Sequence, residues 1–100
     1  MMGDRIAIQF TSEKWHKDSP VLYSHWGGRS MINAVNKFIK QHGKSLKGSS
    51  PGLYMVNFIS WLLAGTISRD YDYDLDDGAT NMMIEDNGTW VYDVEKEEWA

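Results

Sequence analysis

The chain has 100 residues, which is enough for one hydrophobic core and too few for two, so we expect a single domain over residues 1–100. Apolar residues make up 42% of the sequence and aromatic residues 13%, which excludes an intrinsically disordered chain. The absence of cysteine excludes disulfides, thiolate metal sites and a cysteine nucleophile, and a formal charge of −4 disfavours binding to nucleic acid or to an anionic membrane.

The charge and the apolar residues are unevenly distributed. Residues 5–47 are mildly basic, whereas most acidic residues lie in residues 70–98, where Lys96 is the only base. The opening MMGDRIAIQF lacks an apolar run followed by a small-residue cleavage site, so we expect no signal peptide. The longest apolar stretch, LYMVNFISWLLAG, is shorter than the about 20 residues that span a bilayer. We therefore expect a cytoplasmic protein without a membrane partner.

The N-terminal part predicts a β-hairpin. In RIAIQF, residues 5–10, apolar side chains alternate with others, so that Ile6, Ile8 and Phe10 share one face of a half-buried strand. The polar segment TSEKWHKDSP connects this strand to a returning strand, VLYSHW, at residues 21–26. Two glycines then end the strand.

Two helices are predicted next. Ser30 is the expected N-cap of a helix over residues 31–42, Gly43 its stop, and His42 a residue favoured by the dipole at its C-terminal end. The segment GKSLKGSSPG is then a flexible linker. Ser50 caps a second helix over residues 51–64 with Pro51 in its first turn, and this helix is apolar nearly all round and should be the most buried.

Residues 82–94 predict a second hairpin. Asn87-Gly88 between two β-rich runs is typical of a two-residue type I′ turn, which would pair Ile84 with Val91 and Met83 with Tyr92. Large apolar side chains fall on both faces of this hairpin, and two helices can cover only one of them. An uncovered apolar face usually marks an interface, so we expect a homodimer.

The predicted order of elements is therefore β-β-α-α-β-β. The simplest architecture for this order is an α+β fold in which an antiparallel sheet of about four strands packs against two helices.

The segment SHWGGRS contains the groups of an anion-binding corner. A strand ends there, the glycines would let a ligand approach the backbone, and a helix N-terminus presents unpaired N–H groups. Arg29 could bind a phosphate or carboxylate, and Trp26 could stack on a base. The candidate ligand-binding residues are Tyr23, Ser24, His25, Trp26, Gly27, Gly28, Arg29 and Ser30, together with Arg69 and Tyr71. The alternative is a packed turn, or a lock between Arg29 and a carboxylate of residues 70–77.

The segment VLYSHWGG resembles one found in a family of small uncharacterised proteins of phages, prophages and prokaryotic genomes, which share a YSHWGG motif. The matching positions are residues 23–28. The two predicted helices and the C-terminal hairpin resemble that family's organisation, whereas the Asp-rich segment at residues 70–77 does not. The resemblance implies a phage-type setting, in the host cytoplasm, and supplies no mechanism.

The Asp-rich segment RDYDYDLDDG alternates acidic residues with Tyr71, Tyr73 and Leu75. As a calcium loop it fails, because Asp77 stands where such loops need glycine and Met83 where they need a bidentate glutamate. We expect a solvated acidic loop, which could offer its surface to a basic partner. A strand with one acidic and one aromatic face is the alternative.

No nucleophile or metal cluster can be specified, so we expect no catalytic residue, no metal and no cofactor. The leading hypothesis is a small non-enzymatic binding protein that sequesters an anionic, nucleotide-like ligand and so modulates or counters a host process. The first alternative is an acidic protein inhibitor that occludes a host nucleic-acid enzyme. The second is a small hydrolase-like enzyme that uses His25. No direct nucleic-acid partner is expected.

Overall fold

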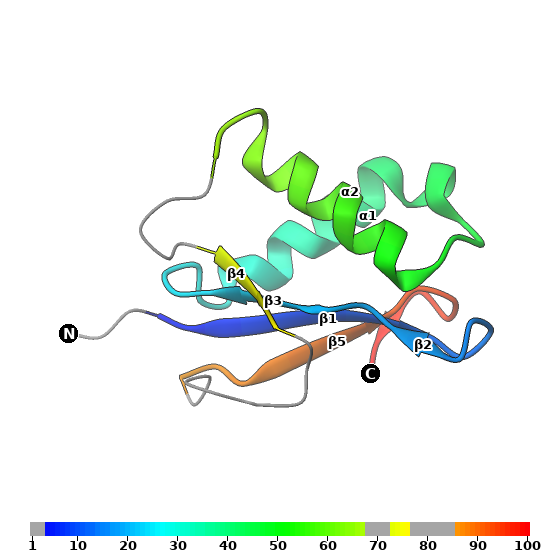
Figure 1. Ribbon diagram of the computed structural model, residues 1–100, viewed down its shortest axis with the longest axis horizontal. Helices are drawn as coiled ribbons and strands as arrows, with labels where there is room; N and C mark the ends of the chain where they lie inside the picture. The colour runs from blue at the N-terminus through cyan, green and yellow to red at the C-terminus, as the bar shows by residue number, and fades with distance from the viewer. Residues whose placement is uncertain (1–3, 68–72, 77–85) are drawn as a thin grey trace.

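The computed structural model describes residues 4–67, 73–76 and 86–100. It has a mixed β-sheet with two helices packed on one face (Figure 1), so the predicted α+β class is confirmed. The elements in chain order are β1 (Ile6–Ser12), β2 (Lys17–Asp18), β3 (Val21–Ser24), α1 (Ser30–Leu46), α2 (Pro51–Leu63), β4 (Tyr73–Asp76), β5 (Thr89–Asp93) and β6 (Glu98–Trp99).

The sheet runs in the order β4-β3-β1-β5-β6, and β2 extends the pairing of β1. The predicted N-terminal hairpin is confirmed, since β1 pairs antiparallel with β2 and β3. The prediction of a purely antiparallel sheet is wrong, because β1 and β5 are parallel, with Ala7 opposite Thr89 and Phe10 opposite Tyr92. Turn residues reveal only pairings between strands joined by a short turn, whereas a long connection with helices lets two strands run in the same direction.

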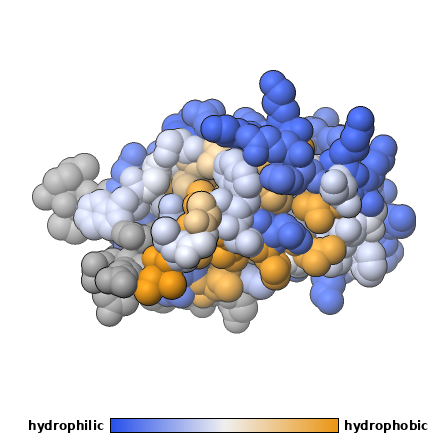
Figure 2. All heavy atoms as spheres, turned by 90° about the horizontal axis from the view of Figure 1, so that it is seen from above, coloured by the Kyte–Doolittle hydropathy of each residue, from blue (hydrophilic) through white to orange (hydrophobic). Residues whose placement is uncertain are grey.

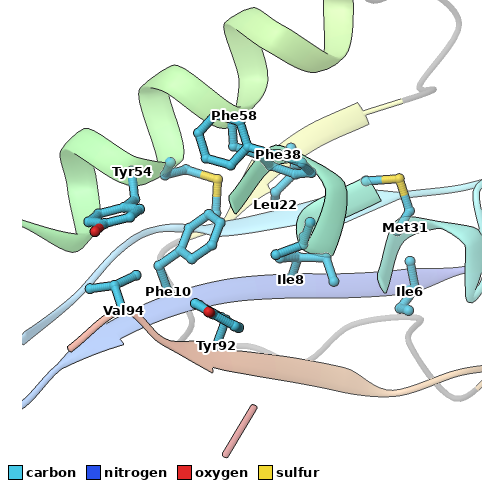
Figure 3. Close-up of a cluster of buried hydrophobic side chains, with 12 residues drawn as sticks. Ile6, Ile8, Phe10, Leu22, Met31, Phe38, Tyr54, Phe58, Tyr92 and Val94 are labelled. Carbon is cyan, nitrogen blue, oxygen red and sulfur yellow. The ribbon is translucent and has the colours of Figure 1, made fainter. Parts of the chain in front are cut away.

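The core lies between the sheet and the helices. Ile6, Ile8 and Phe10 are fully buried, as the alternation in β1 predicts, and Phe38 from α1 and Phe58 from α2 pack with them. Phe10 contacts Phe58 edge to face, with ring centroids 5.9 Å apart. Tyr54, Tyr92 and Val94 lie around Phe10 at one end of this row, and Ile6 and Met31 lie at the other end (Figure 3).

Helix α1 departs from its predicted boundaries. Ser30 is the first helical residue and not the cap, Arg29 holds the cap position without a side-chain cap, and the helix continues through Gly43 to Leu46. The prediction of a flexible linker from residue 43 is therefore wrong for residues 43–46, which are helical. Leu46 packs against the core, and this contact offsets the about 1 kcal/mol by which a glycine disfavours a helix. His42 consequently lies one turn before the helix end, against Phe38.

Helix α2 follows its sequence signals closely. The Ser50 hydroxyl accepts a hydrogen bond from the Leu53 N–H at 3.3 Å, Pro51 lies at the first helical position, and Ala64 ends the helix in the left-handed conformation. Tyr54, Met55 and Phe58 are buried, and α2 is more buried than α1.

The hairpin predicted over residues 82–94 can be compared with the structure only from residue 86 onward. Residues 89–93 form β5, which pairs with β1 and β6, and Gly88 has a φ of 75°. The first arm, which contains Met83 and Ile84, lies outside the described residues. Tyr92 is opposite Phe10 of β1 on one side and Trp99 of β6 on the other, so both of its backbone edges are taken by described strands.

The Asp-rich segment is a strand where the structure describes it. Residues 73–76 form β4 at the sheet edge beside β3, with Asp74 opposite Tyr23 and Leu75 opposite Leu22. The expectation of a loop is therefore wrong for these four residues, because the free edge of β3 provides backbone partners that the sequence does not reveal. Asp70, Asp72 and Asp77 lie outside the described residues.

Candidate functional site

The two glycines of the predicted corner are required by packing. A Cβ on Gly27 would lie 2.6 Å from Met31 Cγ and 2.8 Å from Ser24 Oγ. Gly28 has a φ of +52°, donates its N–H to the Asp4 carbonyl at 2.8 Å, and has the Asp4 carboxylate where its own side chain would be. The fold therefore accounts for both glycines without a ligand.

Arg29 also has a structural partner. Its guanidinium lies 5.2 Å from the centroid of the Trp90 ring, in a cation–π contact between the start of α1 and β5. The alternative prediction is an ion pair between Arg29 and a carboxylate of residues 70–77. Asp74, the residue of this segment whose carboxylate the structure describes, forms no such pair. An anion approaching this helix start would also meet the carboxylate of Asp4, which accepts a hydrogen bond from the Asn87 side chain at 2.6 Å.

The remaining corner residues are only partly brought together. Tyr23 and His25 contact each other edge to face at 4.7 Å, whereas Trp26 is 61% exposed. Ser24 Oγ accepts from the Gly27 N–H at 3.0 Å, and the Ser30 hydroxyl donates to the Gly27 carbonyl. Arg69 and Tyr71 lie outside the described residues. The corner thus stays a predicted site for which the contacts already supply a structural explanation.

A cavity lies at the opposite end of α1 from this corner. We call it the basic cavity. It has a volume of about 630 Å³, within the range of about 300–1,000 Å³ of small-molecule sites. Its walls come from the end of β1 and the β1–β2 turn, the second half of α1, the α1–α2 connection, the first turn of α2, and the end of β5 with the β5–β6 turn. The residues that carry its chemistry are Lys14, Trp15, Lys40, Lys44, Lys47, Tyr54, Tyr92, Glu95 and Glu97.

Lysines dominate the charge of the basic cavity. Lys40, Lys44 and Lys47 follow one another at spacings of four and three residues, which places them on one face of α1 and its C-terminal cap. Lys14 faces the cavity from the β1–β2 turn. All four side chains are exposed, and none forms an ion pair within the described part of the chain. Seen from the helix side, one long margin of the molecule is almost entirely hydrophilic (Figure 2).

The helix dipoles do not supply this positive field. The C-terminal end of α1 and the N-terminal end of α2 both border the cavity, and their partial charges are opposite in sign. Lys44 also stabilises the negative end of α1. The lysine side chains are therefore the source of attraction for an anion.

Two tyrosine hydroxyls reach the cavity from the core. Tyr54 and Tyr92 are only 3% and 5% exposed, yet both line the cavity. Neither hydroxyl has a hydrogen-bond partner among the residues that the structure describes. In the same residues, every fully buried side-chain nitrogen or oxygen atom does have a partner. Both oxygen atoms must then reach the open space. Figure 3 shows the Tyr54 hydroxyl at the outer end of its ring, away from Phe58.

The two hydroxyls are held in their protonated form. Burial raises the pKa of Tyr54 above its ordinary value, and the negative charge of Glu97 raises it further. Burial likewise raises the pKa of Tyr92, with smaller contributions from Glu97, Tyr54 and Asp93. At neutral pH both are therefore hydrogen-bond donors available to an acceptor in the cavity.

The carboxylates lie on the opposite side from the α1 lysines, in the β5–β6 turn. Glu95 is occupied, because its Oε1 accepts from the Lys14 N–H at 2.7 Å and from the Ser12 hydroxyl at 3.4 Å. Four lysines and two tyrosine donors thus face two glutamates, one of which already has partners. This arrangement suits a ligand with several anionic oxygens.

Sequence reasoning missed the basic cavity. The mildly basic character of residues 5–47 and the spacing of Lys40, Lys44 and Lys47 were the available signals. Tyr54 and Tyr92 follow core patterns and carry no separate signal, since only the tertiary fold, in which both rings pack against Phe10, brings them to one cavity.

Neither a metal-ligand cluster nor a membrane-spanning helix is found among the described residues. Residues 4–67, 73–76 and 86–100 contain no cluster of three histidine or acidic side chains able to bind a metal ion. Neither helix in these ranges combines the length and hydrophobicity needed to span a bilayer.

Comparisons with protein-family models, with curated protein sequences and with solved structures find no match to this chain. The resemblance to the family with the YSHWGG motif, and the phage-type setting that it implies, therefore stay predictions.

Proposed function

We propose that this protein is a small ligand-binding protein that holds an anionic ligand in the basic cavity. The observation that carries the proposal is the pair Tyr54 and Tyr92, whose rings are buried and whose hydroxyls, without a partner among the described residues, open into a cavity rimmed by lysines. Hydroxyls that face the cavity can donate to an acceptor bound there, and the four lysines around them supply the positive charge that favours an anionic one.

This proposal keeps the class of ligand expected from the sequence and moves its site. The predicted corner has a carboxylate beside Gly28 and an arginine occupied by Trp90, both of which weaken it as an anion site. The basic cavity has four cations without ion-pair partners in the described part of the chain. Charge complementarity therefore favours the cavity.

Isothermal titration calorimetry with inorganic pyrophosphate at low ionic strength tests the proposal. We expect saturable binding with one site per chain, an affinity that falls as salt is added, and a loss of at least tenfold in a K40A/K44A double variant. A K17A/K37A double variant is the matched control, because it removes the same charge from lysines that do not line the cavity. Absence of binding, or an equal loss in both double variants, would contradict the proposal.

A further inference from the structure

Trp15 forms an anchored aromatic wall of the basic cavity. Its indole Nε1 donates a hydrogen bond to the Gly48 carbonyl at 3.1 Å, which ties the β1–β2 turn to the α1–α2 connection. The side chain is nevertheless 47% exposed. Because the ring is already held in place, a planar group that stacks on it gains contact without the entropic cost of ordering the tryptophan.

No other tryptophan offers this combination. Trp61, Trp90 and Trp99 donate their indole N–H groups to Gln41, Asn87 and Asn36, and all three pack against the core. Trp26 is exposed but does not line the cavity.

The cationic row on α1 is longer than one anionic group needs. Lys40 and Lys47 are seven residues apart, which corresponds to about 10 Å along a helix axis. A single carboxylate or phosphate can reach only part of this row, whereas two linked phosphates extend along it. The carboxylates of the β5–β6 turn repel phosphates and so favour their placement on the lysine side.

We propose that the ligand is a nucleotide with two or more linked phosphates, whose base stacks on Trp15 and whose phosphates bind Lys40, Lys44 and Lys47. This inference rests on the proposed anion-binding function and adds the aromatic part of the ligand. Stacking on an indole is available to every base, so the site is expected to bind adenine and guanine nucleotides with similar affinity.

The test compares ADP, inorganic pyrophosphate and adenosine on the full chain, with calorimetry for affinity. We expect ADP to bind at least tenfold more tightly than pyrophosphate, and adenosine to bind more weakly than either. The W15A variant should lose about tenfold or more in ADP affinity and keep its pyrophosphate affinity, because stacking involves only the base. W15F retains a ring and should lose less.

The W26A variant is the control, because it removes an exposed tryptophan that does not line the cavity. It should bind ADP like the unchanged protein. Equal binding of ADP and pyrophosphate, with no effect of W15A on either, would overturn the nucleotide inference and leave anion binding intact. Failure of both ADP and pyrophosphate to bind would overturn the proposed function, and the inference with it. Thermal unfolding of W15A shows whether any loss reflects an unfolded protein.

Discussion

The carboxylate of Asp4 occupies the space into which a side chain at Gly28 would project. A Cβ built on Gly28 would lie 1.9 Å from Asp4 Oδ2 and 2.4 Å from Asp4 Cγ. The same residue pair is joined by the hydrogen bond from the Gly28 N–H to the Asp4 carbonyl. The segment before β1 and the turn before α1 are thus fitted to each other at this point.

Gly28→Ala should therefore destabilise the protein by more than the about 1–2 kcal/mol expected for left-handed strain alone. Gly48→Ala is the matched control, since Gly48 also has a positive φ, +86°, and a Cβ added there would meet no atom within 4 Å. Chemical denaturation should give a clearly larger loss for Gly28→Ala. An Asp4→Gly change combined with Gly28→Ala should recover part of that loss, and equal losses in the two single variants would contradict the contact.

Arg29→Ala should cost about 0.5–1 kcal/mol of stability, the magnitude of an exposed cation–π contact. Its effect on pyrophosphate or ADP binding should be negligible, because Arg29 does not line the basic cavity. Calorimetry and thermal unfolding of the same preparation separate the two outcomes. Loss of ligand binding with an unchanged melting temperature would instead support the corner as the site.

The raised pKa values of Tyr54 and Tyr92 predict a loss of stability at alkaline pH. Both hydroxyls resist ionisation in the folded state, so their contribution is fully present below the ordinary tyrosine pKa of 10.0 and is lost as pH rises through the higher folded values. The free energy of unfolding should fall less steeply above pH 10 in Tyr92→Phe than in the unchanged protein. Parallel curves from pH 7 to 11 would be inconsistent with this.

Asp86 predicts the opposite dependence at acid pH. Hydrogen bonds from the Arg5 side chain, at 2.9 and 3.3 Å, hold the pKa of this carboxyl below its ordinary value of 3.8. Its contribution is present above that value and is lost as pH falls through the folded pKa. Asp86→Asn should lower the melting temperature at pH 7, with the difference shrinking toward pH 3. Asp74→Asn, an exposed carboxylate on β4, is the control and should change little.

Local patterns predicted local structure well and distant relationships poorly. The alternation of Ile6, Ile8 and Phe10 and the Ser50-Pro51 start of α2 each involve neighbours in the chain, and both are confirmed. Gly43 ends a helix only if no other contact stabilises the next turn. Here Leu46 in that turn packs against the core, which is a tertiary contact that the local sequence does not reveal.

The same limit applies to the candidate site. The basic cavity needs Lys40, Trp15 and Tyr92 on one surface, although they come from a helix, a turn and a distant strand. No spacing in the sequence links these three residues. The YSHWGG corner, in contrast, is contiguous and easily noticed, and its glycines are explained by contacts with Asp4, Ser24 and Met31.

The parallel pairing of β1 and β5 has a kinetic consequence. Ala7 pairs with Thr89, so the centre of the sheet forms only after almost the whole chain has been brought into a closed loop. Such closure has a high entropic cost before any native contact compensates for it, and it slows folding relative to helical proteins of the same length. The helices can form early from local contacts, whereas β1 keeps one edge without its native partner until β5 arrives. During that interval the exposed edge is the part of the chain most prone to pair with another molecule.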